Sequence, residues 1–161
     1  MAAQKLAKLN PSVELVPMYE RISPENVQRI IRGANAVVDG MDNFEGRLAL
    51  NYGCVAESIP FVHGGVSGLN GEVTTIIPGE TPCFACIFPT TPPKRGIASV
   101  FGVTPAIIAA LQAMEVMKLL SGFGDLLAGR MLYINGTTMS FRTSALSIDP
   151  ACRVCGPDRT T

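Results

Sequence analysis

The chain has 161 residues, about the length of one domain, and we predict a single domain over residues 1–161. With 47% hydrophobic and only 16% charged residues, it is too apolar for a disordered polypeptide and can bury a core. Its 13 basic and 13 acidic residues leave no formal net charge and form no basic stripe, which disfavours nucleic acid as a partner.

The chain begins with "AAQKLAKLNP", which has the pattern of the end of an amphipathic helix. Residues 11–22 then alternate apolar and polar side chains and predict a strand. Residues 23–33 predict a short helix, with Ser23 as its N-cap and Pro24 in its first position.

Further along the first half, "ANAVVDG" (34–40) predicts a short buried strand, and "IPFVHGG" (59–65) predicts the next one. The segment between them predicts a helix that Asp42 or Asn43 caps. This strand and helix order predicts a mostly parallel sheet covered by helices.

The second half predicts a strand over 71–79, a long loop over 78–100 and a hairpin over 131–143 that turns at Asn135-Gly136 as a type I′ turn. Its longest helix begins at Thr104 as N-cap and ends at Gly122. Three polar residues interrupt the apolar run of that helix, so no stretch reaches the roughly 18 residues of a membrane span; they are Gln112, Glu115 and Lys118.

Four of the five cysteines form two pairs, Cys83-Cys86 and Cys152-Cys155, in segments rich in proline and glycine. Two such pairs supply the four thiolates of a tetrahedral zinc site, so we predict a structural zinc clip that fastens the 78–100 loop to the C-terminal tail. All four positions would be protein ligands, which excludes a catalytic role for the metal. Iron would use the same ligands, and two separate redox motifs are the other alternative.

Four blocks, taken in order and spacing, carry a resemblance to a known family: "VVDGMDNFEGRLALNYGC", "PFVHGGVSGLNGEVTTIIPGETPCFACIFP", "GVTPAIIAALQAMEVMKLLSG" and "GRMLYINGTTMSFRTSALSIDPACRVCG". The chain resembles the C-terminal portion of the ThiF/MoeB/HesA family of ubiquitin-activating-enzyme-like adenylyltransferases. The fold expected is α/β: a Rossmann-like mixed sheet flanked by helices, with a C-terminal β-hairpin and a four-cysteine zinc clip. No G-x-G-x-x-G motif follows any predicted strand, so we expect the N-terminal nucleotide-loop half to be lacking.

The resemblance implies adenylation, with ATP and Mg²⁺, of the C-terminal glycine of a ubiquitin-like sulfur-carrier protein ending in Gly-Gly, in a thiamin- or molybdopterin-type pathway. It implies that Asp42 is the catalytic residue that handles Mg²⁺, and that Asp39, Asp42 and Asn43 bind the nucleotide. The residues alone also allow Asp42 to be only a helix cap, and Asn43 and Arg47 to be structural. We expect a cytoplasmic chain that is inactive alone and acts with a complementing N-terminal half or as a homodimer.

The main alternative is a non-catalytic, zinc-stapled module that binds a ubiquitin-like protein or dimerises. The missing dinucleotide motif disfavours a nicotinamide dehydrogenase. Residues 92–105 contain no cysteine, which disfavours thiol catalysis there, and Lys94 and Arg95 are interpreted as a solvated basic pair. His63, the only histidine, is interpreted as a core or strand-end residue, and Cys54 as core.

Overall fold

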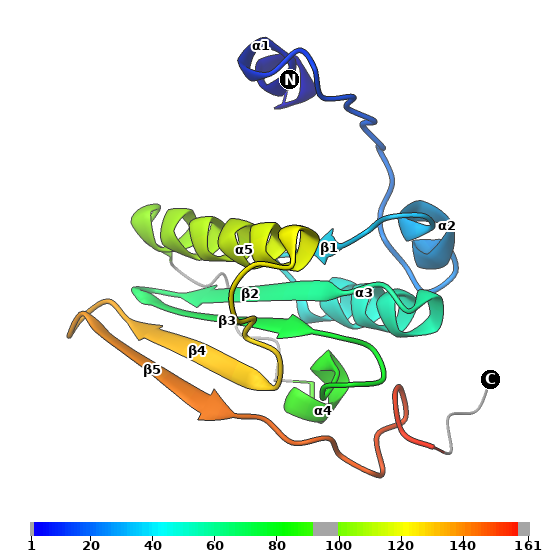
Figure 1. Ribbon diagram of the computed structural model, residues 1–161, viewed down its shortest axis with the longest axis vertical. Coiled ribbons are helices and arrows are strands. Elements are labelled where there is room, and N and C mark those ends of the chain that lie inside the picture. The colour runs from blue at the N-terminus through cyan, green and yellow to red at the C-terminus, as the bar shows by residue number, and fades with distance from the viewer. Residues whose placement is uncertain (1, 92–99, 158–161) are drawn as a thin grey trace.

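The computed structural model describes residues 2–91 and 100–157, and its centre is a five-stranded sheet in the order β1-β2-β3-β4-β5. Only β1 (Val37–Val38) and β2 (Phe61–Ser67) pair in parallel among the described strands. The next strands, β3 (Asn70–Ile76), β4 (Arg130–Asn135) and β5 (Ser140–Ala145), each add antiparallel (Figure 1). The mixed sheet is confirmed, but a mostly parallel one is wrong, because tight turns join β2 to β3 and β4 to β5.

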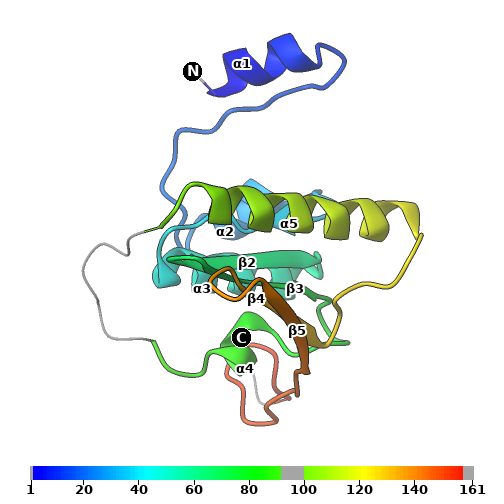
Figure 2. The ribbon, with the colours of Figure 1, turned by 90° about the vertical axis from the view of Figure 1, so that its left-hand side faces the viewer.

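Helices cover both faces of this sheet (Figure 2). On one face lies α5 (Val103–Ser121), while α3 (Phe44–Glu57) and the short α4 (Phe84–Ile87) lie on the other. Two glycines let α5 approach closely: a Cβ atom on Gly64 would lie 2.5 Å from Cδ of Gln112. One on Gly71 would lie 2.4 Å from Cδ1 of Ile108. The sheet face under α5 is therefore shaped to receive it.

The amide of Gln112 ties α5 to the carboxyl end of β1. Its Nε2 donates to the carbonyl oxygens of Asp39, at 2.9 Å, and Val62, at 3.1 Å. Gln112 is buried, and a buried amide is stable only when its donors are satisfied. The contact fixes the height of α5 over the point where β1 ends.

The larger core cluster lies on the opposite side of the sheet. It gathers apolar side chains of α2 (Val27–Ile31), α3, α4 and the adjoining strands. Among its buried members are Val27, Leu50, Phe61, Ile76, Phe84 and Cys152. Two of the paired cysteines, Cys83 and Cys152, belong to it, so the predicted metal clip adjoins the main core.

The amino-terminal region differs from the prediction. A helix is present, α1 (Ala2–Leu9), but residues 11–22 contain no strand, and Val16 and Tyr19 are exposed. A strand needs hydrogen-bonding partners, and within the described residues no strand pairs with the open edge of β1. In Figure 1 this segment runs free of the sheet and carries α1 away from it.

Helix α2 begins later than predicted. Its N-cap is Asn26 rather than Ser23. The Ser23 carbonyl accepts from the backbone N–H of Val27 at 3.0 Å, and the Asn26 Oδ1 accepts from the Ser23 N–H at 2.8 Å. Ser23 therefore opens a turn ahead of the helix instead of capping it.

The long helix also starts one residue early, with Gly102 as N-cap, and the predicted cap Thr104 donates instead to the Gly68 carbonyl oxygen at 2.9 Å. Its end is confirmed, because Gly122 takes the left-handed conformation with φ of 68°. By length and composition alone α5 is long and apolar enough to cross a membrane, and 22% of that span is buried. A single such helix is weak evidence of a membrane span, and this one buries Gln112 and Glu115.

The hairpin of β4 and β5 is confirmed, but its two-residue turn is wrong. Asn135 pairs with Ser140, which leaves residues 136–139 in the turn. The Asn135 Oδ1 accepts from the N–H groups of Thr137, at 3.0 Å, and Thr138, at 3.2 Å, and so stabilises a longer turn. Gly136 serves a close approach, since a Cβ atom there would lie 2.5 Å from the Leu69 carbonyl oxygen.

Candidate functional site

The loop that leaves the carboxyl end of β1 is held by side chains of its own residues. The backbone N–H of Asp39 still donates to Val62 at 2.9 Å, so the ladder reaches this residue. The Asp39 Oδ1 then accepts from the Met41 N–H at 2.9 Å, which turns the chain back. Asn43 ends the loop as the N-cap of α3, with its Oδ1 accepting from the Gly46 N–H at 2.7 Å.

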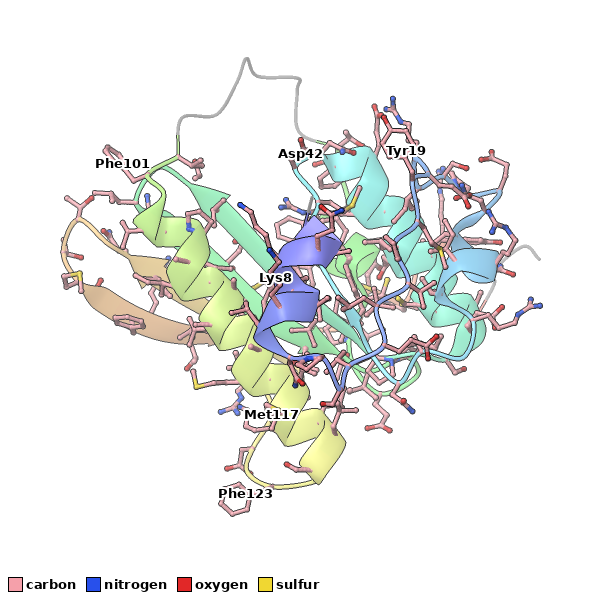
Figure 3. The ribbon with its side chains drawn as sticks, turned by 90° about the horizontal axis from the view of Figure 1, so that it is seen from above. Lys8, Tyr19, Asp42, Phe101, Met117 and Phe123 are labelled. Atoms are coloured by element: carbon pink, nitrogen blue, oxygen red, sulfur yellow. The ribbon has the colours of Figure 1, made fainter. Side chains whose placement is uncertain are left out.

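Because Asn43 caps α3, Asp42 is left with another role. Its side chain is exposed, and the printed contact of its Oδ1 is with Nδ2 of Asn43 at 2.9 Å. Figure 3 shows Asp42 beside the amino end of α3. A carboxylate in this position has free lone pairs, and Mg²⁺ prefers oxygen ligands. The geometry therefore suits a metal or nucleotide contact, and the predicted role of Asp42 stays a prediction.

Asp39 lies inside the protein instead. Its side chain is fully buried, and its Oδ2 is 2.6 Å from Nδ1 of His63 and 3.0 Å from Nε of Arg47. Arg47 also donates to the Met41 carbonyl oxygen at 2.8 Å. Both oxygens of the Asp39 carboxylate thus have protein partners, so its geometry fits a residue that shapes the loop better than one that touches a nucleotide.

His63 lies at the centre of this arrangement and is fully buried. Burial alone would lower the pKa of its imidazole, but hydrogen bonds with Asp39 and Glu72 outweigh it and raise the pKa above its ordinary value of 6.5. The interpretation as a buried residue is confirmed, while its ionic partners were missed. The hairpin register places His63 opposite Thr74, and only that register reveals Glu72 as a neighbour.

A cavity of about 450 Å³ opens beside this network, over strands β2 to β5. Arg47 and Glu72 line it, and so does Arg142, whose guanidinium lies 5.1 Å from the centre of the Tyr133 ring. Most of its other lining residues carry polar side chains or are glycines: Gly65, Ser67, Asn70, Gly71, Asn135 and Ser140. The cavity is therefore suited to a polar or charged ligand such as a peptide segment.

The four paired cysteines come together as predicted, and we call them the four-cysteine cluster. Their sulfur atoms all lie within 4.8 Å of one another. The sulfur of Cys83 is 3.6 Å from that of Cys152, and the sulfur of Cys86 is 3.3 Å from that of Cys155. Sulfurs bound to one tetrahedral zinc at about 2.3 Å would lie roughly 3.8 Å apart, so the arrangement fits that metal.

Local turns close both cysteine pairs. The Cys86 N–H donates to the Cys83 carbonyl oxygen at 3.0 Å, and the Gly156 N–H donates to that of Cys152 at 2.8 Å. A Cβ atom on Gly156 would lie 2.4 Å from the Cys152 oxygen, so this turn requires glycine. Each turn points its two sulfurs toward the same point, which is the requirement of a shared ion.

The thiols of the cluster do not titrate alike in the metal-free chain. Burial raises the pKa of Cys83 to about 11, and burial together with neighbouring thiols raises the pKa of Cys155. Burial also acts on Cys152, but hydrogen bonds from the backbone of Cys155 and Val154 outweigh it and lower the pKa to about 7. A metal would bind all four as thiolates, so its binding must release protons. Lys94 and Arg95 fall outside the described residues.

Comparison with solved structures identifies the fold. The chain superimposes on E. coli MccB, in a crystal structure with MccA-N7isoASN, with a TM-score of 0.82 at 20% sequence identity. The match covers 96% of this chain and 50% of that one. At this identity the likeness shows the shared fold: a mixed sheet flanked by helices.

Sequence relatives are much closer. The chain is 39% identical over 160 residues to the SAMP-activating enzyme E1 of Haloferax volcanii, covering 96% of this chain and 59% of that protein. It is 36% identical over 170 residues to the sulfur carrier protein adenylyltransferase of Thermus thermophilus, covering 99% and 63%. The chain thus spans about six tenths of the length of these relatives. The sequence model of the ThiF family matches residues 1–154, and the chain belongs to the ThiF family.

Proposed function

We propose that this chain supplies the magnesium-handling part of an adenylation site that activates the C-terminal glycine of a ubiquitin-like sulfur-carrier protein. The names of the relatives support this choice, since one activates SAMP and another adenylylates a sulfur carrier protein. The observation that carries the proposal is the placement of Asp42. Its carboxylate is exposed at the carboxyl end of β1 while Asn43 performs the capping. Ligands of open α/β sheets bind outside the carboxyl ends of the strands.

In the proposed reaction, an oxygen of the carrier's terminal carboxylate attacks the α-phosphorus of ATP. A new P–O bond forms, the bond to the bridging oxygen breaks, and pyrophosphate leaves with the electron pair. Both reactants are anions, so Mg²⁺ supplies charge neutralisation at the phosphates. Asp42 would hold this ion through carboxylate oxygens, and the Asp39–Met41 hydrogen bond would fix the loop that carries it.

The four-cysteine cluster supports the same site as a structural zinc clip. It would join α4 to residues 152–155 across the main core, and neither segment is held there by a strand. All four ligand positions would be filled by sulfur, so the ion would have no position for a substrate. Zinc is proposed over iron because the cluster lies among residues with a structural role.

The proposal includes a second polypeptide segment. ATP-binding α/β sites hold phosphates with a glycine-rich loop at a helix N-terminus, and this chain carries no such motif after a strand. The outer side of α5 supports association, because it exposes apolar side chains there. Among them are Val103, Met114, Met117 and Leu120, and Figure 3 shows Met117 with Phe123 just beyond the helix. A complementing segment is proposed as the partner there, and the cytoplasm as the compartment.

ATP–pyrophosphate exchange tests the proposal. The 161-residue chain would be assayed alone, and again with a complementing polypeptide that carries a glycine-rich phosphate loop, with Mg²⁺ and a carrier ending in Gly-Gly. We expect exchange only in the mixture. We expect Asp42→Ala to lower the exchange rate by about 100-fold or more, as loss of a group that stabilises transition-state charge does.

Asn43→Ala is the matched control, since it removes the helix cap and keeps the Asp42 carboxylate. Robust exchange by the chain alone would refute the need for a second segment, and normal exchange by the Asp42→Ala mixture would refute the role of Asp42. Carrier binding that survives Asp42→Ala without nucleotide binding would instead favour a non-catalytic module that docks a ubiquitin-like protein.

A further inference from the structure

Four charged or titratable side chains form a line from the Asp42 loop into the cavity. The line runs from Arg47 to Asp39, then to His63 and to Glu72. Its inner members, Asp39 and His63, have fully buried side chains, while its outer members, Arg47 and Glu72, line the same cavity. None of the chemistry proposed for the reaction uses His63 or Glu72.

The contacts on the two sides of the His63 ring are unequal. Its Nδ1 lies 2.6 Å from Oδ2 of Asp39, while its Nε2 lies 3.5 Å from Oε1 of Glu72 and makes no hydrogen bond within the described residues. Gly65, across the ladder from Glu72, leaves the space in which the carboxylate folds back. A Cβ atom on Gly65 would lie 2.9 Å from Oε1 of Glu72.

The charges that face the ring come from three elements. Asp39 follows β1, Arg47 belongs to α3 and Glu72 to β3, whereas α4 and the residue after it present uncharged rings to His63. With an imidazolium, two cations balance two carboxylates. With a neutral imidazole that still donates from Nδ1 to Asp39, the Nε2 lone pair faces the Glu72 carboxylate, and one buried negative charge is uncompensated.

We propose that His63 is a positioning residue whose imidazolium form holds the Glu72 carboxylate at the cavity wall and the Asp39 carboxylate under the Asp42 loop. Loss of the proton turns Glu72 toward the cavity and loosens the hydrogen bond from Met41 to Asp39. The protonation state of one buried histidine thus sets both the charge of the cavity and the order of the loop. The consequence for catalysis rests on the proposed function, but the structural coupling does not.

The raised pKa of His63 fixes the direction of this effect. A group whose pKa is higher in the folded chain stabilises the fold most where it is protonated, below its ordinary value of 6.5, and this contribution is lost as pH rises through the folded pKa. Above that pH we therefore expect Glu72 to be released and the loop to be less ordered.

Nuclear magnetic resonance measures the coupling without any ligand or activity. His63 is the only histidine, so in an untagged chain the imidazole Cε1–H signal needs no assignment. We expect it to titrate with a midpoint above pH 6.5, and we expect the backbone amide of Met41 to shift with the same midpoint. Glu72→Gln should move the imidazole midpoint to lower pH, because it removes one of the two carboxylates.

Glu80→Gln removes an equal charge from an exposed position and should leave the midpoint unchanged. Gly65→Ala offers an independent perturbation: it keeps the Glu72 charge but displaces the carboxylate, so the midpoint should again fall. A midpoint unaffected by both Glu72→Gln and Gly65→Ala overturns the proposal. A Met41 amide that ignores the titration of His63 also overturns it. Neither outcome depends on whether the chain adenylates a carrier, so failure of the proposed function is seen separately.

Discussion

Replacing Asn51 with leucine removes the side chain that joins α3 to the first cysteine pair. Asn51 is fully buried, and its Oδ1 accepts from the backbone N–H of Phe84 at 2.8 Å. Leucine has a similar size and no acceptor, so the Phe84 N–H would be buried without a partner. Leaving a buried donor unsatisfied costs about 1–3 kcal/mol of the free energy of unfolding. For a domain of this size that is a fall in Tm of roughly 2–12 °C.

The same replacement acts on the metal site. Burial is the largest influence on the Cys83 thiol and raises its pKa, while the Asn51 side chain acts in the opposite direction and favours the thiolate. Without Asn51, zinc must displace a more firmly held proton, so we expect weaker zinc binding in competition with a chelating indicator at fixed pH.

Urea unfolding followed by circular dichroism measures the stability change, with the metal present and after chelation. Tyr52→Leu is the matched control: its side chain is 45% exposed on the same helix, so a change within about 0.5 kcal/mol is expected. An Asn51→Leu chain with the unfolding free energy and the zinc affinity of the unaltered chain would refute this account of α4.

The other predictions concern separate parts of the chain. Asn43→Ala should lower the free energy of unfolding by about 0.5–2 kcal/mol through loss of the α3 cap, as urea unfolding would show. Gly156→Ala should destabilise by about 1–3 kcal/mol through crowding against Cys152, and unfolding measured with zinc bound checks it. Metal analysis should give about one zinc per chain held by the four-cysteine cluster, and titration with zinc should show affinity falling as pH falls, because protons compete for the thiolates. Met117→Glu should weaken association with a complementing segment, measured by sedimentation.

The sequence predicted most elements whose signal is local. The helix of α3, the end of α5 at Gly122 and the strands β2 and β3 all follow from apolar periodicity and from capping or turn residues. The four-cysteine cluster was also predictable, because the chemistry of paired cysteines implies their meeting, however far apart they lie in the chain.

The errors occur where a non-local contact decides the structure. Alternation over residues 11–22 matches a strand, but a strand forms only beside a partner, and no described strand pairs with the open edge of β1. Asn135-Gly136 suggested a two-residue turn, but Asn135 bonds two later amides and Gly136 docks on Leu69. Local preference was overruled in both places by what lies nearby in space.

His63 illustrates the same limit at the candidate site. A lone histidine on an apolar strand is most simply core, and it is buried, yet burial was only half of the answer. Its partners come from positions distant in the chain, Asp39 after β1 and Glu72 on β3. Sequence alternation alone gives the face of each strand but not the register that brings these side chains together.

The four-cysteine cluster and the Asp42 loop are parts of one packed unit. Phe84 lies between the two cysteines of the first pair, and its ring centre is 5.0 Å from that of His63; the ring centre of Phe88 is 5.8 Å away. His63 in turn holds Asp39, whose carboxylate fixes the Met41 amide next to Asp42. Close packing transmits displacement because interiors contain few voids. A metal that fixes α4 therefore also fixes the rings against which His63 is placed, so a structural ion with no open ligand position still contributes to the geometry of the loop that carries Asp42.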